Sequence, residues 1–334
     1  MTEPVLEVRD LRVAFGPPGR EVEVVHGVDL CIDAGEIVGM VGESGSGKSV
    51  TATAASALLP GAARMSTAAW RFEGTDLASA DRRQLGDALG GKLAVVFQDP
   101  MSSLNPARRV GAQMSDVVRV HGGRSRREAL ADAVDRLRRV RIASPERRVH
   151  EHPHQFSGGM RQRAMIAMGL MATPSLLVAD EPTTALDVTV QAEIMELIRE
   201  LNETMGTAVL LVSHNIALIA EVCSRVLVMY AGRIVEELPA SELTSAARHP
   251  YTRALMDAVP RFDTSRSEPL ATIPGAPPDP AEPVAGCPFA PRCPWVEDRC
   301  RVVEPQLVRI GSGSVACHVA VDAHEAAEKE AVDR

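Results

Sequence analysis

The residues best suited to chemistry form a glycine-rich run, Gly42-Glu43-Ser44-Gly45-Ser46-Gly47-Lys48-Ser49. It lies between an apolar stretch predicted as a strand, residues 37–41, and an Ala-rich segment of helical character, about 49–58. A strand, a glycine loop and a helix in this order are the context in which G-x-x-x-x-G-K-S binds phosphate. Backbone N–H groups of the loop can surround an anion, and the helix N-terminus adds its positive dipole end. Lys48 can reach the β- and γ-phosphates of a nucleotide, and the Ser49 hydroxyl can ligate Mg²⁺.

A second stretch, Ser157-Gly158-Gly159, predicts another helix end suited to anions. The helix is expected to run to about Met171. Ser157 is a favourable N-cap, and the two glycines leave the N–H groups of the first turn uncovered by side chains. One chain therefore carries two separate anion-binding helix ends.

Polar residues follow three apolar runs that are predicted as buried strands. Gln98 follows the first run, Asp180 and Glu181 follow the second, and His214 lies just past the third. Ligands of open parallel sheets bind at the carboxyl ends of the strands. We therefore expect these side chains to converge on the nucleotide held by Lys48.

The chemistry expected of these four residues is hydrolysis of a phosphoanhydride. Asp180 suits Mg²⁺ coordination, and Glu181 can polarise the attacking water. Gln98 can contact the metal or the water, and His214 can contact the γ-phosphate. A helix-capping turn is the alternative for the Asp-Glu pair, and the presence of Lys48 upstream disfavours it.

The order of elements predicts an α/β fold with a mostly parallel sheet and helices on both faces. Ahead of the glycine loop, alternation over residues 5–13 and β-like runs between 22 and 32 predict an antiparallel layer. Phe15 follows the first of these runs, where stacking on an adenine and burial within the sheet are both reasonable interpretations. An arginine-rich helical segment, about 110–142, is typical of a solvated face, with contact to acidic lipid headgroups as the alternative.

Composition excludes several classes of protein. The 334 residues suggest two domains, and 45% apolar content is enough for a sizeable core. A net charge of -8 argues against a general nucleic-acid binder, which must neutralise phosphates. No apolar run is long enough to span a bilayer, and the N-terminus lacks the features of a signal peptide. We therefore expect a cytosolic chain that reaches a membrane only through a partner.

The motifs together resemble those of ATP-binding-cassette (ABC) ATPases. The run 156–163, beginning Phe156-Ser157-Gly158-Gly159, resembles the family's signature motif, and 180–187 resembles its Walker B and D-loop. Gln98 resembles the Q-loop glutamine and His214 the switch histidine. Met160 stands where many members have glutamine, in a helical turn whose backbone contacts phosphate, so little effect is expected. The resemblance implies nucleotide contacts from Phe15, Gly42, Ser44, Gly45, Ser46, Gly47, Lys48, Ser49, Val50, Gln98 and Asp180, with Mg²⁺ held through Ser49, Gln98 and Asp180.

In that family the phosphate loop of one subunit faces the signature of a second, and two ATP molecules lie between them. The resemblance thus implies that Ser157, Gly158 and Gly159 contact the ATP of a partner subunit. It also implies that Glu181, His214 and Gln98 catalyse hydrolysis of the chain's own ATP.

A narrower resemblance is to the ATPase subunits of bacterial oligopeptide, dipeptide and nickel importers. It rests on residues 98–106, 158–163, 249–255 and 273–278. It implies a peripheral translocase subunit on the cytoplasmic face of the bacterial inner membrane. Its expected partners are two transmembrane permease subunits, an extracytoplasmic solute-binding protein and a second ATPase subunit, for which a paralogue is favoured over a second copy. The segment between Gln98 and Ser157 would dock on the membrane subunits.

We therefore expect a P-loop ABC ATPase domain over residues 1–245, with a helical subdomain at about 100–172. Residues 246–334 are expected to form a small Cys-rich C-terminal domain with a loose acidic tail after Val321.

Four cysteines crowd the C-terminal region: Cys287, Cys293, Cys300 and Cys317. In a reducing cytosol such a group is more often a metal site than a set of disulfides. No C-x₂₋₄-C pair typical of structural zinc is present, so the wider gaps favour a [4Fe–4S] cluster, with Zn²⁺ as the alternative. The family resemblance implies the same cluster. A structural role is favoured over electron transfer.

Two other classes of function compete with an importer ATPase. A soluble ABC protein acting on DNA or ribosomes usually carries two cassettes or long coiled-coil insertions, and this chain has neither. A P-loop kinase or small GTPase would lack the Ser157-Gly158-Gly159 helix start and His214.

Overall fold

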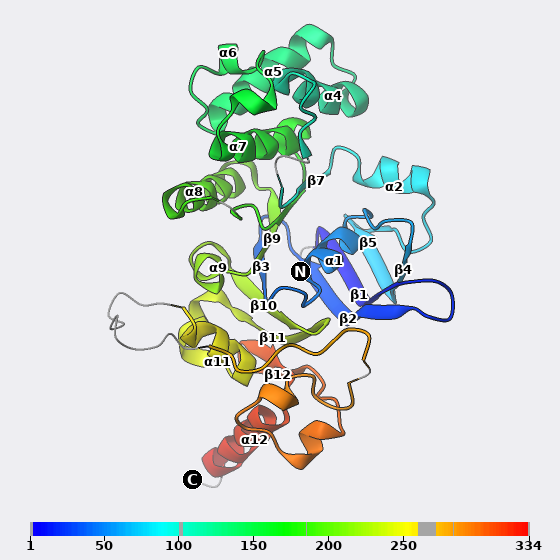
Figure 1. Cartoon of the computed structure of the whole chain (residues 1–334), viewed down its shortest axis with the longest axis vertical. Helices are drawn as coiled ribbons and strands as arrows, with labels where there is room; N and C mark the ends of the chain where they lie inside the picture. The colour runs from blue at the N-terminus through cyan, green and yellow to red at the C-terminus, as the bar shows by residue number, and fades with distance from the viewer. Residues whose placement is uncertain (1–2, 100–102, 185, 260–271, 283, 333–334) are drawn as a thin grey trace.

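The computed structural model describes residues 3–99, 103–184, 186–259, 272–282 and 284–332. Two β-sheets and the helices packed on them make up the chain, with the helical region at one end and the C-terminal segment at the other (Figure 1).

The smaller sheet is antiparallel, as predicted, but only two of its strands precede the glycine loop and the other three follow it. Its central strand, β1, pairs with β2 on one side and with β4 and β5 on the other, and β5 pairs with β6. The strands are β1 (Leu6–Phe15), β2 (Val22–Ile32), β4 (Ala63–Ser66), β5 (Ala69–Phe72) and β6 (Thr75–Asp76).

The larger sheet has the strand order β12-β13-β11-β10-β3-β9-β8-β7. From β10 to β7 every pairing is parallel, and from β10 to β12 every pairing is antiparallel. The strands are β3 (Ile37–Val41), β7 (Leu93–Val96), β8 (Leu176–Asp180), β9 (Ala208–Ser213), β10 (Arg225–Tyr230), β11 (Arg233–Pro239), β12 (Val308–Ile310) and β13 (Gly313–Val315). The mostly parallel core predicted from the sequence is confirmed.

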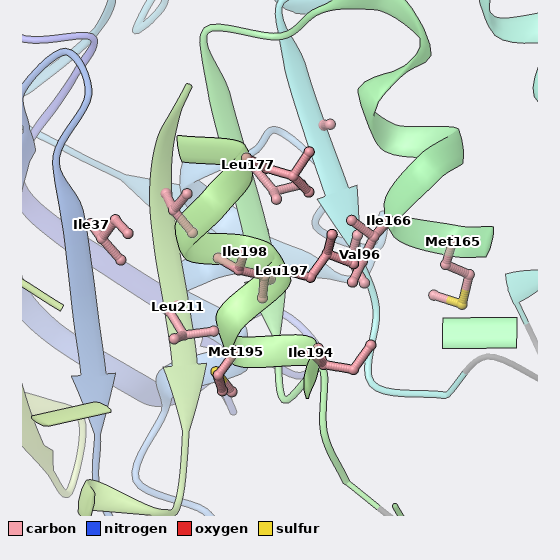
Figure 2. Packing of buried hydrophobic residues seen from close by; sticks show 14 of the residues in the cluster. Ile37, Val96, Met165, Ile166, Leu177, Ile194, Met195, Leu197, Ile198 and Leu211 are labelled. Carbon is pink, nitrogen blue, oxygen red and sulfur yellow. The ribbon is translucent and has the colours of Figure 1, made fainter. Parts of the chain in front are cut away.

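The parallel strands are apolar on both faces and separate two hydrophobic cores. Within β8, Leu176 and Val178 point into the core shared with the antiparallel sheet, whereas Leu177 and Ala179 point into the core shared with the helices. This follows from the two-residue period of a strand, and it explains why the run shows no polar alternation. Figure 2 shows the helical side, where Leu177 and Leu211 of the sheet meet Leu197 and Ile198 of helix α8.

Residues 110–142, where the sequence suggested one continuous helical pattern, contain two helices. Helix α4 (Val110–Gly122) ends at Gly123, which adopts a left-handed conformation, φ 61°. Ser125 then caps α5 (Arg126–Arg139), and its hydroxyl accepts from the Glu128 N–H while Glu128 reaches back to the Ser125 N–H. A glycine C-cap followed by a capping box divides the segment.

Over the described residues, the other helices belong to the helical region, pack on the sheets or lie in the C-terminal region. They are α1 (Lys48–Ala55), α2 (Arg82–Leu89), α6 (Pro145–Arg148), α7 (Gly158–Gly169), α8 (Val188–Met205), α9 (Ile216–Val222), α10 (Leu243–Ala246), α11 (Pro250–Asp257) and α12 (His318–Val332), with short 3₁₀ turns η1 (Pro153–Gln155), η2 (Leu170–Ala172), η3 (Ala240–Glu242), η4 (Ala290–Arg292) and η5 (Asp298–Arg301).

The C-terminal region does not support the expected separate Cys-rich domain. Strand β13 pairs with β11 and extends the larger sheet, so these residues continue the nucleotide-binding fold. Tyr251 and Phe289 are buried in the same core as α8 and stack near Tyr230 of β10, with ring centroids 4.6 and 5.3 Å from that of Tyr230. The segment therefore shares hydrophobic burial with the ATPase core rather than building its own.

The loose tail expected after Val321 is also wrong over the described residues. Helix α12 runs from His318 to Val332, and Val319, Ala320 and Val321 pack on a small cluster around Ile310. Asp322 accepts from Arg299 of η5. The first turn of the helix is thus held by apolar contact and an ion pair, which composition alone did not reveal.

His249 gives this region a measurable pH dependence. It is 1% exposed, caps α11 by accepting from the Tyr251 N–H at 3.1 Å, and burial lowers its pKa to about 3. The unfolded state binds a proton on this side chain below about pH 6.5, whereas the folded state does not. Its contribution therefore weakens folding as the pH falls from about 6.5 towards 3.

We predict that His249→Asn, which retains an N-capping oxygen, makes the acid loss of stability shallower by about 1 kcal/mol between pH 6.5 and 5.5. Urea unfolding across this range measures the difference. Burial raises the pKa of the neighbouring Glu236. Because Glu236 is present in both proteins, its contribution to the pH dependence of stability cancels in the comparison. The exposed His154→Asn serves as the control. Equal slopes for wild type and His249→Asn would contradict the prediction.

Candidate functional site

The glycine loop connects β3 to α1 in a backbone conformation that requires glycine. Gly47 is the N-cap of α1 with φ 101°, and a Cβ there would lie 2.9 Å from Met229 Cε and 3.1 Å from the Val24 carbonyl oxygen. Helix α1 begins at Lys48, so its N-terminal N–H groups face the loop. This is the strand, loop and helix arrangement predicted for phosphate binding.

Lys48 lies inside the loop rather than at the surface. Its side chain is buried, and Nζ donates to the carbonyl oxygens of Gly42 at 2.8 Å and Glu43 at 2.9 Å. Burial lowers the pKa of Lys48, while the carboxylates of Glu181 and Asp180 act in the opposite direction. A cationic side chain is therefore held inside the loop that the sequence predicts to bind phosphate.

Ser49 and Asp180 meet across the end of the parallel sheet. The Ser49 hydroxyl donates to Asp180 Oδ1 at 2.9 Å. Burial raises the pKa of Asp180, while the Ser49 hydrogen bond and the Lys48 charge lower it. A hydroxyl oxygen and a carboxylate this close are hard oxygen donors of the kind Mg²⁺ takes beside nucleotide phosphates, so the residues present fit that ion.

Glu181 is the point at which three strand ends meet. Its Oε2 accepts from Gln98 Nε2 at 3.1 Å and from the Thr184 hydroxyl at 2.8 Å, and His214 Nδ1 lies 3.3 Å away. Glu181 itself has φ 46°, and its N–H donates to the Val212 carbonyl at 2.9 Å, which fixes its backbone beside β9. The convergence expected from the sequence is present, and a polar carboxylate is oriented from three sides.

The sequence analysis missed Thr184 as a partner of Glu181. The only available signal was its position three residues after Glu181, which is within reach of a tight turn. Two of the motifs predicted from the sequence lie partly outside the described residues. Pro100, Met101 and Ser102 of the run 98–106 are not described, nor is Ala185 of the run 180–187.

The second helix end, Ser157-Gly158-Gly159, lies away from the glycine loop. Helix α7 belongs to the helical region, whereas α1 lies beside the sheets (Figure 1). Ser157 caps the helix by accepting from the Met160 N–H at 3.3 Å, and Ser157 and Gly158 are exposed. A Cβ at Gly159 would lie 2.8 Å from Val190 Cγ1, so glycine lets α7 pack closely on α8. The helix end that the sequence predicts to bind an anion is therefore exposed.

Phe15 and Val50 were both predicted to contact the nucleotide. Phe15 ends β1 and is half-buried, and both side chains pack against the core of the antiparallel sheet. Adenine stacking by Phe15 stays a prediction.

The four C-terminal cysteines come together around one small cavity. Cys287, Cys293, Cys300 and Cys317 line one small cavity beside His249. Burial raises the pKa of Cys287 to about 11, which favours the neutral form of this thiol. Within the part of the chain that the structure describes, no group of three or more His, Cys, Asp or Glu side chains is arranged to hold a metal ion. The expected iron–sulfur or zinc site is therefore not supported by this geometry.

Comparison with known proteins decides the family. A family model described as ABC transporter matches residues 25–184, and one described as the C-terminal region of oligopeptide/dipeptide transporters matches residues 235–300. A probable peptide ABC transporter ATP-binding protein of Sinorhizobium fredii is 48% identical over 93% of both chains. The chain belongs to the ABC transporter ATP-binding proteins.

Other relatives of this ABC ATPase are also named as ATP-binding proteins of peptide transport. The dipeptide transport ATP-binding protein DppD of Haemophilus influenzae is 43% identical, over 94% of this chain and 95% of the relative. The oligopeptide transport ATP-binding protein OppD of Salmonella typhimurium is 46% identical, over 90% and 89%. Membership in this family makes the chain an ATPase, as its motifs predicted.

Solved structures agree on the fold of the ABC ATPase. The dimeric post-hydrolysis state of the cassette MJ0796, bound to ADP and Pi, has a TM-score of 0.63 and 25% identity, and covers 70% of this chain and 98% of its own. CbiO1 of Clostridium perfringens, part of the transporter complex cbiONQ, has the same TM-score and identity over 73% and 92%. Among the described residues, none of the helices is both long and apolar enough to cross a membrane.

We predict that Lys48→Ala weakens ATP binding by about ten- to hundredfold, because it removes a charge-assisted contact to the phosphates. Titration with a fluorescent ATP analogue measures the dissociation constant. Lys92→Ala, which removes an exposed lysine paired with Glu73 at 2.8 Å, is the matched control. Undiminished affinity in the Lys48 variant would exclude this lysine from the site.

Proposed function

We propose that this chain hydrolyses ATP to energise the import of peptides, or a related small solute, across the bacterial cytoplasmic membrane. The observation that carries the proposal is the meeting of Gln98, Glu181 and His214 beside Lys48 and Asp180. The transporter-type C-terminal region and the names of the relatives support peptides as the solute class. Nucleic acid is not among the proposed partners.

In this proposal the residues of the site divide the work of hydrolysis. Gly42, Ser44, Gly45, Ser46, Gly47, Lys48, Ser49 and Val50 bind the phosphates, and Phe15 stacks on the adenine. Glu181 is the general base that orients the attacking water, and its hydrogen bond from Gln98 holds its carboxylate in place. His214 contacts the γ-phosphate.

Ser49, Asp180 and Gln98 are the proposed magnesium-binding residues. Bound Mg²⁺ supplies charge neutralisation of the phosphate oxygens. The 2.9 Å contact between Ser49 and Asp180 supports this assignment, because it brings two oxygen donors together at the mouth of the loop.

A second ATPase subunit is needed to complete the site, and we propose that it is a paralogue. Ser157, Gly158 and Gly159 would then contact the partner's ATP. The outward exposure of this helix end supports the arrangement, since it is separate from the chain's own phosphate loop. The solved relative MJ0796 is described as dimeric.

The proposed location is the cytoplasmic face of the inner membrane, where the chain is peripheral to two permease subunits served by an extracytoplasmic solute-binding protein. The segment between Gln98 and Ser157 would dock on the permeases. Phe97 supports this surface, because it is 43% exposed and directly precedes Gln98. Movement at the docking surface would thereby reach the residue that holds Glu181.

We also propose the functional division suggested by the motifs, with nucleotide chemistry in residues 1–245 and a transporter-type extension in residues 246–334. The second family match, residues 235–300, overlaps this boundary. The extension shares the core and sheet of the first part, so the division concerns function rather than independent folding.

We predict that Glu181→Gln lowers the rate of ATP hydrolysis by at least about a hundredfold while ATP affinity changes less than threefold, because the amide cannot accept a proton. In vesicles containing the whole transporter, peptide uptake should fall with hydrolysis. Glu203→Gln, the same change at an exposed position of α8, is the control. Normal turnover in the Glu181 variant would exclude it as the base, and uptake independent of hydrolysis would exclude ATP-driven import.

For the cysteines, we propose a structural [4Fe–4S] cluster held by Cys287, Cys293, Cys300 and Cys317, with Zn²⁺ as the alternative. Their shared cavity supports the proposal, since four distant sequence positions reach one place. Ligation would require the thiols to approach one another and to lose their protons.

Anaerobic purification tests the cluster directly. We predict about four iron and four sulfide per chain, visible absorbance, and loss of both when Cys300→Ser is introduced. Cys31→Ser, outside the cavity, is the control. A colourless protein with stoichiometric zinc and no iron would contradict the cluster, and absence of both metals would contradict any metal role.

A further inference from the structure

A buried arginine of the C-terminal extension reaches the phosphate loop. The side chain of Arg292 is 4% exposed, and its guanidinium forms a bidentate ion pair with Glu43, at 2.6 and 3.0 Å. The two residues are 249 positions apart in the sequence. Planar guanidinium and carboxylate groups paired in this way define orientation as well as charge.

The same arginine holds the C-terminal segment in place. Its Nε donates to the Pro274 carbonyl at 2.8 Å, and Nη2 donates to the Ile273 carbonyl at 3.2 Å. Nη1 also donates to the Tyr230 hydroxyl at 3.3 Å. Arg292 therefore connects β10 and the extension to one residue of the loop.

Glu43 is held at its backbone as well as at its side chain. Its N–H donates to the buried Tyr251 hydroxyl at 2.7 Å, and its carbonyl accepts from Lys48 Nζ at 2.9 Å. A continuous series of contacts thus runs from Arg292 through Glu43 to the phosphate-binding lysine. Two side chains of the extension, Arg292 and Tyr251, determine where this part of the loop lies.

The charge of Glu43 makes this contact consequential. A carboxylate within a loop that must bind a polyanion repels that anion, and the repulsion is strong at short range in a partly buried site. The Arg292 guanidinium stays protonated at all physiological pH values and pairs with both carboxylate oxygens. With the pair intact, the loop presents Lys48 and backbone N–H groups, and its own carboxylate, that of Glu43, is neutralised.

The extension also forms a wall beside the loop. A cavity of about 470 Å³ is lined by Ser44, Gly45 and Ser46 of the loop, by Val22 and Val24 of β2, and by the proline-rich segment 277–280. This segment follows the two carbonyls that Arg292 holds. The position of the wall therefore depends on the same side chain.

We propose that Arg292 is a positioning residue of the ATP site, which neutralises and orients Glu43 so that the phosphate loop accepts the triphosphate. Arg292 acts on ATP affinity through Glu43, and the step catalysed by Glu181 does not use it. The C-terminal extension thereby contributes to nucleotide binding within its own chain.

A double-mutant cycle on the full-length protein tests this assignment, with MgATP as the ligand. Arg292→Gln leaves the Glu43 carboxylate unpaired, and we expect the dissociation constant and KM for MgATP to rise about tenfold while kcat at saturation stays within about twofold. Glu43→Gln alone should change affinity by less than about threefold. Combining both changes should return affinity to within about threefold of wild type, because the repelling charge is gone.

The rescue separates charge neutralisation from a merely structural role. If the double variant binds ATP as weakly as Arg292→Gln, or if Arg292→Gln binds as well as wild type, the proposal is wrong. Arg299→Gln, which breaks the exposed pair with Asp322 in the same extension, is the matched control and should bind normally. If Arg292→Gln does not fold, Arg292→Lys keeps the charge but not the bidentate geometry and should bind ATP with an intermediate affinity. Wild-type affinity in that variant would show that the charge alone is sufficient and would contradict the orienting role of the bidentate pair.

This inference rests on ATP binding at the loop, and the wild-type measurement keeps the two apart. Failure of the wild-type protein to bind MgATP would refute the proposed function itself. Normal wild-type binding with no effect at Arg292 would refute only the role of this arginine.

Discussion

The register of four parallel strands is the constraint on which the site depends. Val41 lies opposite Ser213, Asp180 opposite Val212, and Val96 opposite Ala179. The strands therefore end together, and the residues that follow them emerge at one edge. A shift of one residue would turn each side chain to the other face of the sheet, so the register that buries two cores also sets the chemistry.

Burial gives these side chains their properties. Lys48 and Asp180 lie where solvent is partly excluded, and each has its pKa shifted against its charged form. Hydrogen bonds and opposite charges counter that shift. A bound nucleotide with its metal would add further charges that favour the charged forms of Lys48 and Asp180. Glu181 is oriented by Gln98, Thr184 and His214, so its direction is set before substrate arrives.

The C-terminal extension is part of the nucleotide-binding fold in physical terms. It adds β13 and β12 to the sheet, buries Tyr251 and Phe289 in the shared core, and pairs Arg292 with the phosphate loop. These contacts explain why residues 246–334 do not form the separate domain expected from the sequence. The extension has little apolar core of its own and gains burial from the surface it covers.

The sequence by itself determined the local features. Glycine spacing predicted the phosphate loop because a φ near 101°, as at Gly47, is one that residues with a side chain rarely adopt. Apolar runs predicted β3, β7, β8 and β9 because strands buried on both faces are continuously apolar. Ser157 predicted the start of α7 because N-capping is an interaction between residues close in sequence. Contacts between distant residues were beyond such reasoning. The break at Gly123, the helical tail and the pairing of Arg292 with Glu43 depend on which surfaces meet, and only the tertiary structure decides that.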